Sequence, residues 1–246
     1  MGFQLLEELM KQLLKSGICA FAVLMGVALA QTNPPPAAGN DSSQDLNAIL
    51  TRMDQTAKAF KTARAEFVFE QFQKVVNETD TQKGKIYFRR TKSGVEMAAQ
   101  ITQPNEKYVV FDDGKLRMYQ PNIDQETVYN TGKNRADIES FMVLGFGGGG
   151  HDLLKSFNVR SLGTEEAQGV KAAKLELVPK SVKLRNTFAQ ILLWIDPARG
   201  VSVQQEFIEP SGDYRLDKFF NIESNAKLPN DVFKLKTTDK TKVISP

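Results

Sequence analysis

The sequence predicts an α+β protein, mainly antiparallel β, in which about eleven strands form one strongly curved or closed sheet covered by short helices. Most of the chain after residue 65 alternates apolar and polar residues in short runs. Turn sequences rich in glycine, proline, asparagine and aspartate separate these runs. Only two stretches, 45–60 and 134–157, place apolar residues at helical spacing.

The first 30 residues have the pattern of a secretory signal peptide. Two lysines precede an apolar run over residues 18–29, and residues 28–30 (Ala-Leu-Ala) form an A-x-A cleavage site. We therefore expect cleavage before Gln31 and export to the periplasm. The one cysteine of the chain lies inside the apolar run, so the mature chain has no thiol chemistry. Residues 31–44 are expected to form a disordered linker.

Residues 45–246 are expected to form a single domain, because the sequence shows no internal repeat and no linker in mid-chain. A segment of this length can bury a substantial core. The formal net charge is +3, which is too mild to indicate a nucleic-acid partner. We expect no nucleic acid to bind.

The first element of the domain is an amphipathic helix over residues 45–60. Its apolar residues fall on one face and must cover another part of the protein. Ser42 or Ser43 is the expected N-cap. The apolar face consists of Leu46, Ile49, Leu50, Met53, Ala57 and Phe60.

The next element is a hairpin whose two strands, 66–76 and 85–90, flank a polar, turn-rich segment. Ile86, Phe88 and Arg90 share one face of the second strand. A guanidinium on the same face as two large apolar side chains has two possible environments. It either reaches water at the end of the strand or pairs with a group across the space that this face encloses. Both interpretations are open at this point.

The remaining strands follow in short succession. Asp113-Gly114 is a strong signal for a tight hairpin, and residues 197–200 and 210–212 are typical turns. These nine strands are expected at residues 95–101, 107–111, 115–119, 125–129, 157–162, 170–178, 188–196, 201–209 and 214–222.

One segment, 134–157, interrupts the strands with two short helical patterns. Between them lie four consecutive glycines, Gly147, Gly148, Gly149 and Gly150, which carry no side chains to pack and lose much backbone entropy when fixed. This pattern indicates either a hinge in a mobile lid over the sheet or an ordinary crossover between two helices. The two interpretations are compatible.

The chain is poorly supplied for catalysis and well supplied with apolar surface. His151 is the only histidine, and no cysteine accompanies it, so we expect neither a catalytic triad nor a metal site, and no cofactor. The glycine run lacks the G-K-[ST] of a phosphate loop. By contrast, 14 of the 16 phenylalanines remain in the mature chain and supply side chains for a filled core or for an apolar ligand cavity.

Several short motifs stand out by their order and spacing: residues 65–71 (Ala-Glu-Phe-x-x-x-Gln), 84–90 (Gly-Lys-Ile-Tyr-Phe-Arg-Arg), 102–104 (Thr-Gln-Pro), 113–115 (Asp-Gly-Lys) with Tyr119, Pro121 and Gln125, and 233–236 (Phe-Lys-Leu-Lys). Together they resemble the LolA family of periplasmic carriers that take lipoproteins from the inner to the outer membrane. The sequence departs from the family in three places: the proline that usually follows the arginine of the second strand is Thr91 here, the stretch 91–102 is longer, and the glycine run is unusual.

The resemblance implies an incomplete (half) β-barrel, open on one side, whose helical lid covers a cavity for acyl chains. It assigns to Arg90 the role of a latch that holds the lid, and to residues 233–236 a closing strand. Within such a cavity, strand phase and the helical pattern select nine candidate lining residues. These are Phe67, Phe69, Phe88, Val95, Met97, Leu116, Met118, Phe141 and Met142.

We therefore expect a carrier of lipoprotein acyl chains and not an enzyme. The resemblance implies an inner-membrane lipoprotein-releasing transporter as donor and an outer-membrane lipoprotein receptor as acceptor. We expect a monomer, although the sequence carries no direct signal of oligomeric state. The alternatives are a related periplasmic protein that carries glycolipid or another envelope lipid, and a regulatory module that senses lipoproteins.

Overall fold

The computed structural model describes residues 41–246 except 133–134, 230 and 246. The expected signal peptide and residues 31–40 of the expected linker lie outside the described residues. Helix α2 spans Asp41–Ala59, so it begins earlier than expected. Ser42 and Ser43 lie inside this helix, and the prediction that one of them is its N-cap was wrong.

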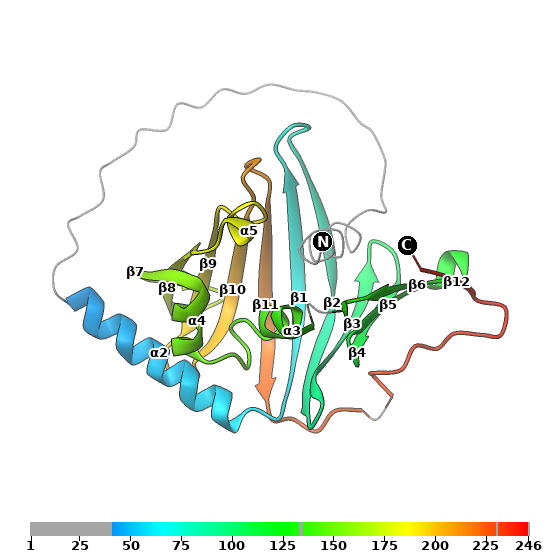
Figure 1. The fold of residues 1–246 in the computed structure, drawn as a ribbon, viewed down its shortest axis with the longest axis horizontal. Helices are drawn as coiled ribbons and strands as arrows, with labels where there is room; N and C mark the ends of the chain where they lie inside the picture. The colour runs from blue at the N-terminus through cyan, green and yellow to red at the C-terminus, as the bar shows by residue number, and fades with distance from the viewer. Residues whose placement is uncertain (1–40, 133–134, 230, 246) are drawn as a thin grey trace.

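Within the described chain, twelve strands form one open sheet in the order β12-β6-β5-β4-β3-β2-β1-β11-β10-β9-β8-β7 (Figure 1). All neighbours pair antiparallel except β12 and β6, which are parallel. The strands are β1 (Thr62–Gln73), β2 (Glu78–Thr91), β3 (Gly94–Gln103), β4 (Lys107–Asp112), β5 (Lys115–Gln120), β6 (Gln125–Asn130), β7 (Phe157–Ala167), β8 (Val170–Pro179), β9 (Gln190–Asp196), β10 (Val201–Ile208), β11 (Tyr214–Ser224) and β12 (Lys242–Ile244).

This topology confirms the predicted α+β class and the mainly antiparallel, incompletely closed sheet. Strands β1–β6 and β7–β11 each follow one another as neighbours, and the pairing of β1 with β11 joins the two series. The twelfth strand, β12, was not expected. Residues 231–234 form turns, so the closing strand implied at 233–236 was wrong. The first hairpin turns at residues 74–77, which lie earlier than the turn-rich segment predicted.

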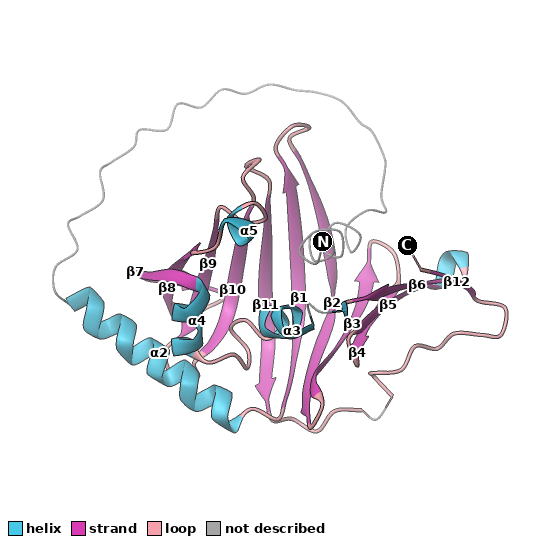
Figure 2. Cartoon of the chain, viewed as in Figure 1, coloured by secondary structure: helices cyan, strands magenta, loops and turns pink. Residues whose placement is uncertain are grey.

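The helices lie along one face of the sheet, as Figure 2 shows. Helix α2 runs across one end, α4 (Gly150–Ser156) lies beside it, and α3 (Arg135–Met142) crosses the middle of the sheet. A turn of helix, α5 (Val182–Arg185), and a 3-10 turn, η1 (Pro121–Ile123), complete the described elements. None of the described helices is long and apolar enough to cross a membrane.

Two apolar clusters divide the inner, helix-covered face. The first belongs to β1–β5 and β11 and includes Phe67, Phe88, Phe111 and Phe219. The second belongs to β8–β10 and includes residues of α2 and α4, which fill the space above these strands. We call the first region the cavity half and the second the filled half.

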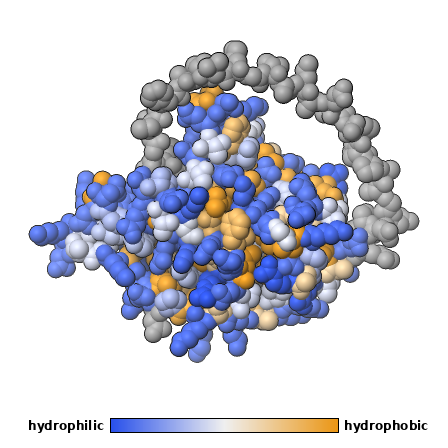
Figure 3. Space-filling view, turned by 180° about the vertical axis from the view of Figure 1, so that it is seen from behind, coloured by the Kyte–Doolittle hydropathy of each residue, from blue (hydrophilic) through white to orange (hydrophobic). Residues whose placement is uncertain are grey.

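The outer face carries the segment that follows β11. Val232 and Phe233 are buried there against Tyr87, Ala98 and Val110. Seen from behind, the molecule presents mostly hydrophilic residues with apolar side chains scattered among them (Figure 3). The large apolar side chains that organise the fold therefore lie mainly on the inner face.

Candidate functional site

An apolar cavity of about 140 Å³ lies in the cavity half, beneath α3. Six of the nine predicted lining residues surround it, which places β1, β2, β3, β5 and α3 around one space. The six are Phe69, Phe88, Met97, Leu116, Phe141 and Met142.

The other three predicted residues lie elsewhere. Phe67 and Met118 are buried in the same apolar cluster without lining the cavity. The ring of Phe67 stacks on that of Phe69, with centroids 3.9 Å apart. Val95 pairs in register with Arg90, and its backbone N–H donates to Glu139 at 3.4 Å. Its place near the end of the strand sets it at the edge of the site.

Sequence reasoning missed further lining residues. Ile86, Ala99 and Ile101 share a strand and a face with predicted residues, so strand phase alone could have identified them. Val109 on β4 shares this face through its pairing with Ala99. Phe207 and Phe219 enter the cavity from β10 and β11 because β11 pairs with β1. Ile138 and Phe146 come from the helical segment above.

Four polar residues also line this cavity, namely Gln82, Gln205, Arg215 and Asp217. Arg215 Nε lies 2.8 Å from Asp217 Oδ1, and the two side chains are 14% and 3% exposed. The Arg215 guanidinium also lies over the rings of Phe207 and Phe69, at 4.7 and 5.6 Å from their centroids. Burial raises the pKa of Asp217 to about 6, although Arg215 opposes this shift.

Arg90 extends from β2 to the segment that links α3 and α4. Its Nη2 donates to the backbone carbonyl of Gly147 at 2.9 Å, and its Nη1 donates to that of Ala57 at 3.4 Å. The guanidinium carbon lies 5.3 Å from the centroid of the Phe60 ring. Of the two interpretations of its phase, the structure therefore shows the one in which Arg90 finds a partner. Its role as a latch remains a prediction.

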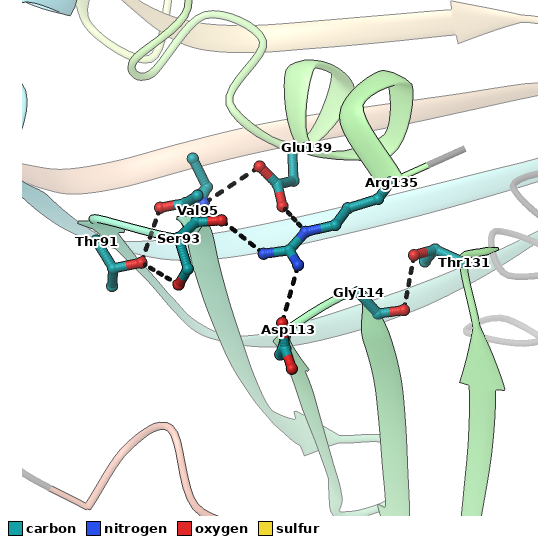
Figure 4. A network of polar contacts seen from close by, with 9 residues as sticks. Thr91, Ser93, Val95, Asp113, Gly114, Thr131, Arg135 and Glu139 are labelled. Atoms are coloured by element: carbon teal, nitrogen blue, oxygen red, sulfur yellow. Dashed lines mark hydrogen bonds and ion pairs between the residues drawn. The ribbon is translucent and has the colours of Figure 1, made fainter. Parts of the chain in front are cut away.

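A second polar network fixes α3 to the ends of the strands below it (Figure 4). Arg135 donates to Glu139 Oε1 at 2.6 Å, to Asp113 Oδ1 at 2.9 Å and to the carbonyl of Ser93 at 2.7 Å. The Glu139 carboxylate lies so close to Gly94 that a Cβ there would approach Oε2 to 2.5 Å, and Gly94 has φ +138°. A glycine is therefore required where the β2–β3 turn meets the helix.

The segment after α3 is also tied to β10. Gln205 Nε2 donates to the carbonyl of Leu144 at 2.7 Å, and the backbone N–H of Ser202 donates to that of Gly145 at 2.6 Å. Gly145 has φ +75°, and a Cβ there would meet Ser202 Cβ at 2.5 Å. We call α3 together with residues 143–149 the lid segment.

The glycine run lets a side chain and a backbone from other elements approach closely. A Cβ on Gly147 would lie 2.7 Å from the ring of Phe60, and one on Gly150 would lie 2.3 Å from the carbonyl oxygen of Leu50 in α2. These contacts give the glycines a packing role. The predicted hinge role for residues 147–150 is not tested by the geometry and stays a prediction.

An open cleft of about 860 Å³ lies on the other side of the lid segment, toward α2, α4 and α5. Phe141 and Leu144 line both the cleft and the inner cavity, so these two side chains form part of the wall between them. Arg90 lies in this cleft, together with Gly147. Displacement of the lid segment would join the two spaces.

His151 holds α4 to α2. Its Nδ1 lies 2.5 Å from Asp54 Oδ2, and its Nε2 lies 3.2 Å from Asn47 Oδ1. Burial tends to raise the pKa of Asp54, but hydrogen bonds from the side chain and backbone of His151 outweigh this effect and lower it. Among the described residues, no three His, Cys, Asp or Glu side chains gather in a way that could hold a metal ion.

The structure is thus an open antiparallel sheet with an apolar cavity under a helical lid. The family model described as outer membrane lipoprotein carrier protein LolA matches residues 58–236, so the chain belongs to the LolA family. This is a family of carrier and binding proteins of the periplasm or cell envelope, and it is not an enzyme family. In the comparison with curated proteins, nothing matches this chain.

Solved structures with a similar fold include MucB, at 14% sequence identity and a TM-score of 0.51. The match covers 78% of this chain and 63% of MucB. An uncharacterized conserved protein from Thermus thermophilus is 11% identical, with a TM-score of 0.51 and coverage of 83% of this chain and 98% of that protein. At identities this low, the likeness shows a shared fold alone.

Proposed function

We propose that this protein is a periplasmic carrier that holds the acyl chains of lipoproteins beneath its lid segment and moves them from the inner to the outer membrane. In this role Arg90 is the latch of the lid segment, and residues 147–150 are its hinge. The cavity predicted from the sequence is its binding site. The donor is an inner-membrane lipoprotein-releasing transporter and the acceptor an outer-membrane lipoprotein receptor, as for the family.

The observation that carries this proposal is the closed lid segment between two spaces. The inner cavity, at about 140 Å³, is smaller than the roughly 300–1,000 Å³ of typical ligand sites. The cleft beyond Phe141 and Leu144 has about 860 Å³. An acyl chain therefore requires displacement of the lid segment, which exposes the apolar cluster to the cleft.

A comparison of the closed, empty state with the open, loaded state supports such a displacement. Apolar contacts of Ile138, Phe141 and Phe146 hold the lid segment to the clusters below it. It is also attached through side-chain and backbone hydrogen bonds that involve Arg90, Arg135, Glu139, Ser202 and Gln205. Each is worth roughly 0.5–1.5 kcal/mol net. Each buried methylene contributes roughly 0.8 kcal/mol. A single acyl chain therefore offsets the loss of all these bonds, and an empty protein closes again.

The test is native mass spectrometry, with lipid extraction, of the mature protein purified from its own periplasm. We expect a lipoprotein or its acylated peptide in a one-to-one complex. A bound glycolipid or phospholipid would favour the alternative carrier role. A protein that takes up no hydrophobic probe would overturn the proposal. A lipoprotein that binds only together with a membrane partner would favour a sensing module.

A further inference from the structure

The four polar residues of the cavity form a belt across the inner face of the central strands. In register, Phe69 on β1 lies between Asp217 on β11 and Gln82 on β2. Asp217 in turn pairs with Gln205 on β10. Arg215 lies one inward-facing position further along β11. We call Gln82, Gln205, Arg215 and Asp217 the polar belt.

The belt marks a change in polarity along the strands. On the side of α2, the row through Phe67 carries Phe219 and Gly84. On the side of the β1–β2 turn, the inward positions pass from Gln71, which pairs with Asp80, to the exposed Gln73. The polar belt therefore lies at the boundary between the apolar floor of the cavity and the water-facing end of the sheet.

The chemistry of the belt does not suit a hydrocarbon chain alone. Removing a charged pair from water carries a large desolvation penalty, and apolar residues of similar size often serve stability as well or better. The Arg215–Asp217 pair is nevertheless kept at the wall of an apolar cavity. Burial has already raised the pKa of Asp217, which reports the cost of this location. A ligand with hydrogen-bonding atoms would give the belt a use.

We propose that the polar belt binds the ester or amide carbonyl groups that join acyl chains to the polar part of a lipid anchor. Carbonyl oxygens accept hydrogen bonds and donate none, and the guanidinium of Arg215 and the amides of Gln82 and Gln205 carry donors. One N–H of Gln205 also donates to the Leu144 carbonyl in the closed state. The acyl chains then extend from the belt toward Phe88 and Met97. This inference rests on the proposed function and names the part of the ligand that the site recognises.

The experiment compares two fluorescent probes with the same polar group and chain length. One is a diacyl probe with ester links, and the other is the dialkyl ether, which lacks the carbonyls. We expect the protein to bind the ester about tenfold more tightly, as one hydrogen bond to a charged group predicts. The double variant Arg215→Met with Asp217→Leu should lose this preference and still bind the ether.

The matched control removes an ion pair from the opposite face of the same strands. Lys218 and Glu70 form that pair, with Nζ and Oε1 2.7 Å apart. The control Lys218→Met with Glu70→Leu should keep the ester preference. Equal binding of the two probes by the unaltered protein overturns the belt proposal alone, whether or not the double variant folds. A double variant that retains the preference also overturns it. If neither probe binds, the proposed function fails as well.

Discussion

The filled half and the cavity half of the inner face use the same strand alternation but differ in what covers them. Over β8–β10, α2 and α4 bring apolar side chains into one cluster with Leu175, Leu193 and Ile195, each 0% exposed. Over β1–β5, the lid segment and Phe60 cover the strands, and a cavity lies beneath the lid segment. Apolar packing of two helices secures the first half, while over the second the lid segment combines apolar contacts of Ile138 and Phe146 with hydrogen bonds from neighbouring strands. The comparison supports the proposal that the lid segment is the part that opens.

The largest expected effect tests whether the filled half is the more tightly packed. Leu193→Ala removes a fully buried side chain from a filled cluster and should lower the free energy of unfolding by about 3–5 kcal/mol. Leu116→Ala, at the wall of the existing cavity, should lower it by about 2 kcal/mol because that side chain has fewer partner atoms to lose. Urea denaturation measures both. Equal losses would contradict the distinction between the halves.

A second prediction uses two buried carboxyl groups, Asp217 at the cavity and Asp196 at the end of β9. The pKa of Asp217 is about 6 against an ordinary 3.8, so the folded state holds a proton that the unfolded state has already lost. As pH rises from about 4 to 7, the wild type should therefore lose on the order of 3 kcal/mol relative to Asp217→Asn. Denaturation of both proteins across this range measures the difference. A constant difference would show that the shift is absent.

Asp196, at the end of β9, supplies the control of opposite sign. Burial tends to raise its pKa, but hydrogen bonds from Arg199 and Ala198 lower it overall. Its contribution to stability is present above the ordinary pKa and fades as pH falls through the depressed value. Wild type should thus lose stability relative to Asp196→Asn as the pH falls. Relative to Asp217→Asn, by contrast, wild type should gain stability as the pH falls.

A third prediction concerns the glycines that let backbones meet. A Cβ at residue 150 would lie 2.3 Å from a backbone oxygen of α2, which cannot rotate away. Gly150→Ala should therefore cost about 1–3 kcal/mol of stability. At Gly148 the nearest atom to such a Cβ is Val143 O at 3.3 Å, so Gly148→Ala should cost less. Thermal unfolding ranks the two variants, and the reverse ranking would contradict close packing as the reason for Gly150.

The cavity half could be predicted from the sequence where strands follow one another through short turns. Alternation fixes which residues of β2, β3 and β5 share a face, and this was enough for Phe88, Met97 and Leu116. Phase does not fix where along a strand the cavity lies, which is why Val95 falls at its edge. The charge of Arg90 indicated a polar contact, because a guanidinium on the same strand face as Phe88 needs a partner.

The rest depends on contacts between distant parts of the chain. Nothing in the local pattern shows that β11 pairs with β1, so the entry of Phe219 and Asp217 into the cavity was not predictable. Strand β12 has three residues and is held through Asp124, which accepts from Thr241 at 2.7 Å. The network of Arg135 likewise joins a helix to two separate turns. Local periodicity carries no signal for such pairings.

We expect the smallest change in stability from a substitution of Arg90, which donates a hydrogen bond to the lid segment. Arg90→Leu removes hydrogen bonds to the carbonyls of Gly147 and Ala57 and should lower the free energy of unfolding by only about 1 kcal/mol. Amide hydrogen exchange across residues 143–149 should nevertheless accelerate, while the amides of α2 keep their protection. Arg89→Leu is the matched control, because Arg89 lies on the outer face over Phe233.

In a carrier, the consequences of Arg90→Leu follow from the direction of the lid equilibrium. The latch stabilises only the closed, empty state, so its loss strengthens the binding of acyl chains and slows their release. Uptake from a donor should be preserved, and transfer to an acceptor should fall. Strong exchange protection across residues 140–155 in both empty proteins would show that the lid segment does not open. The cavity would then be a packing defect of the core.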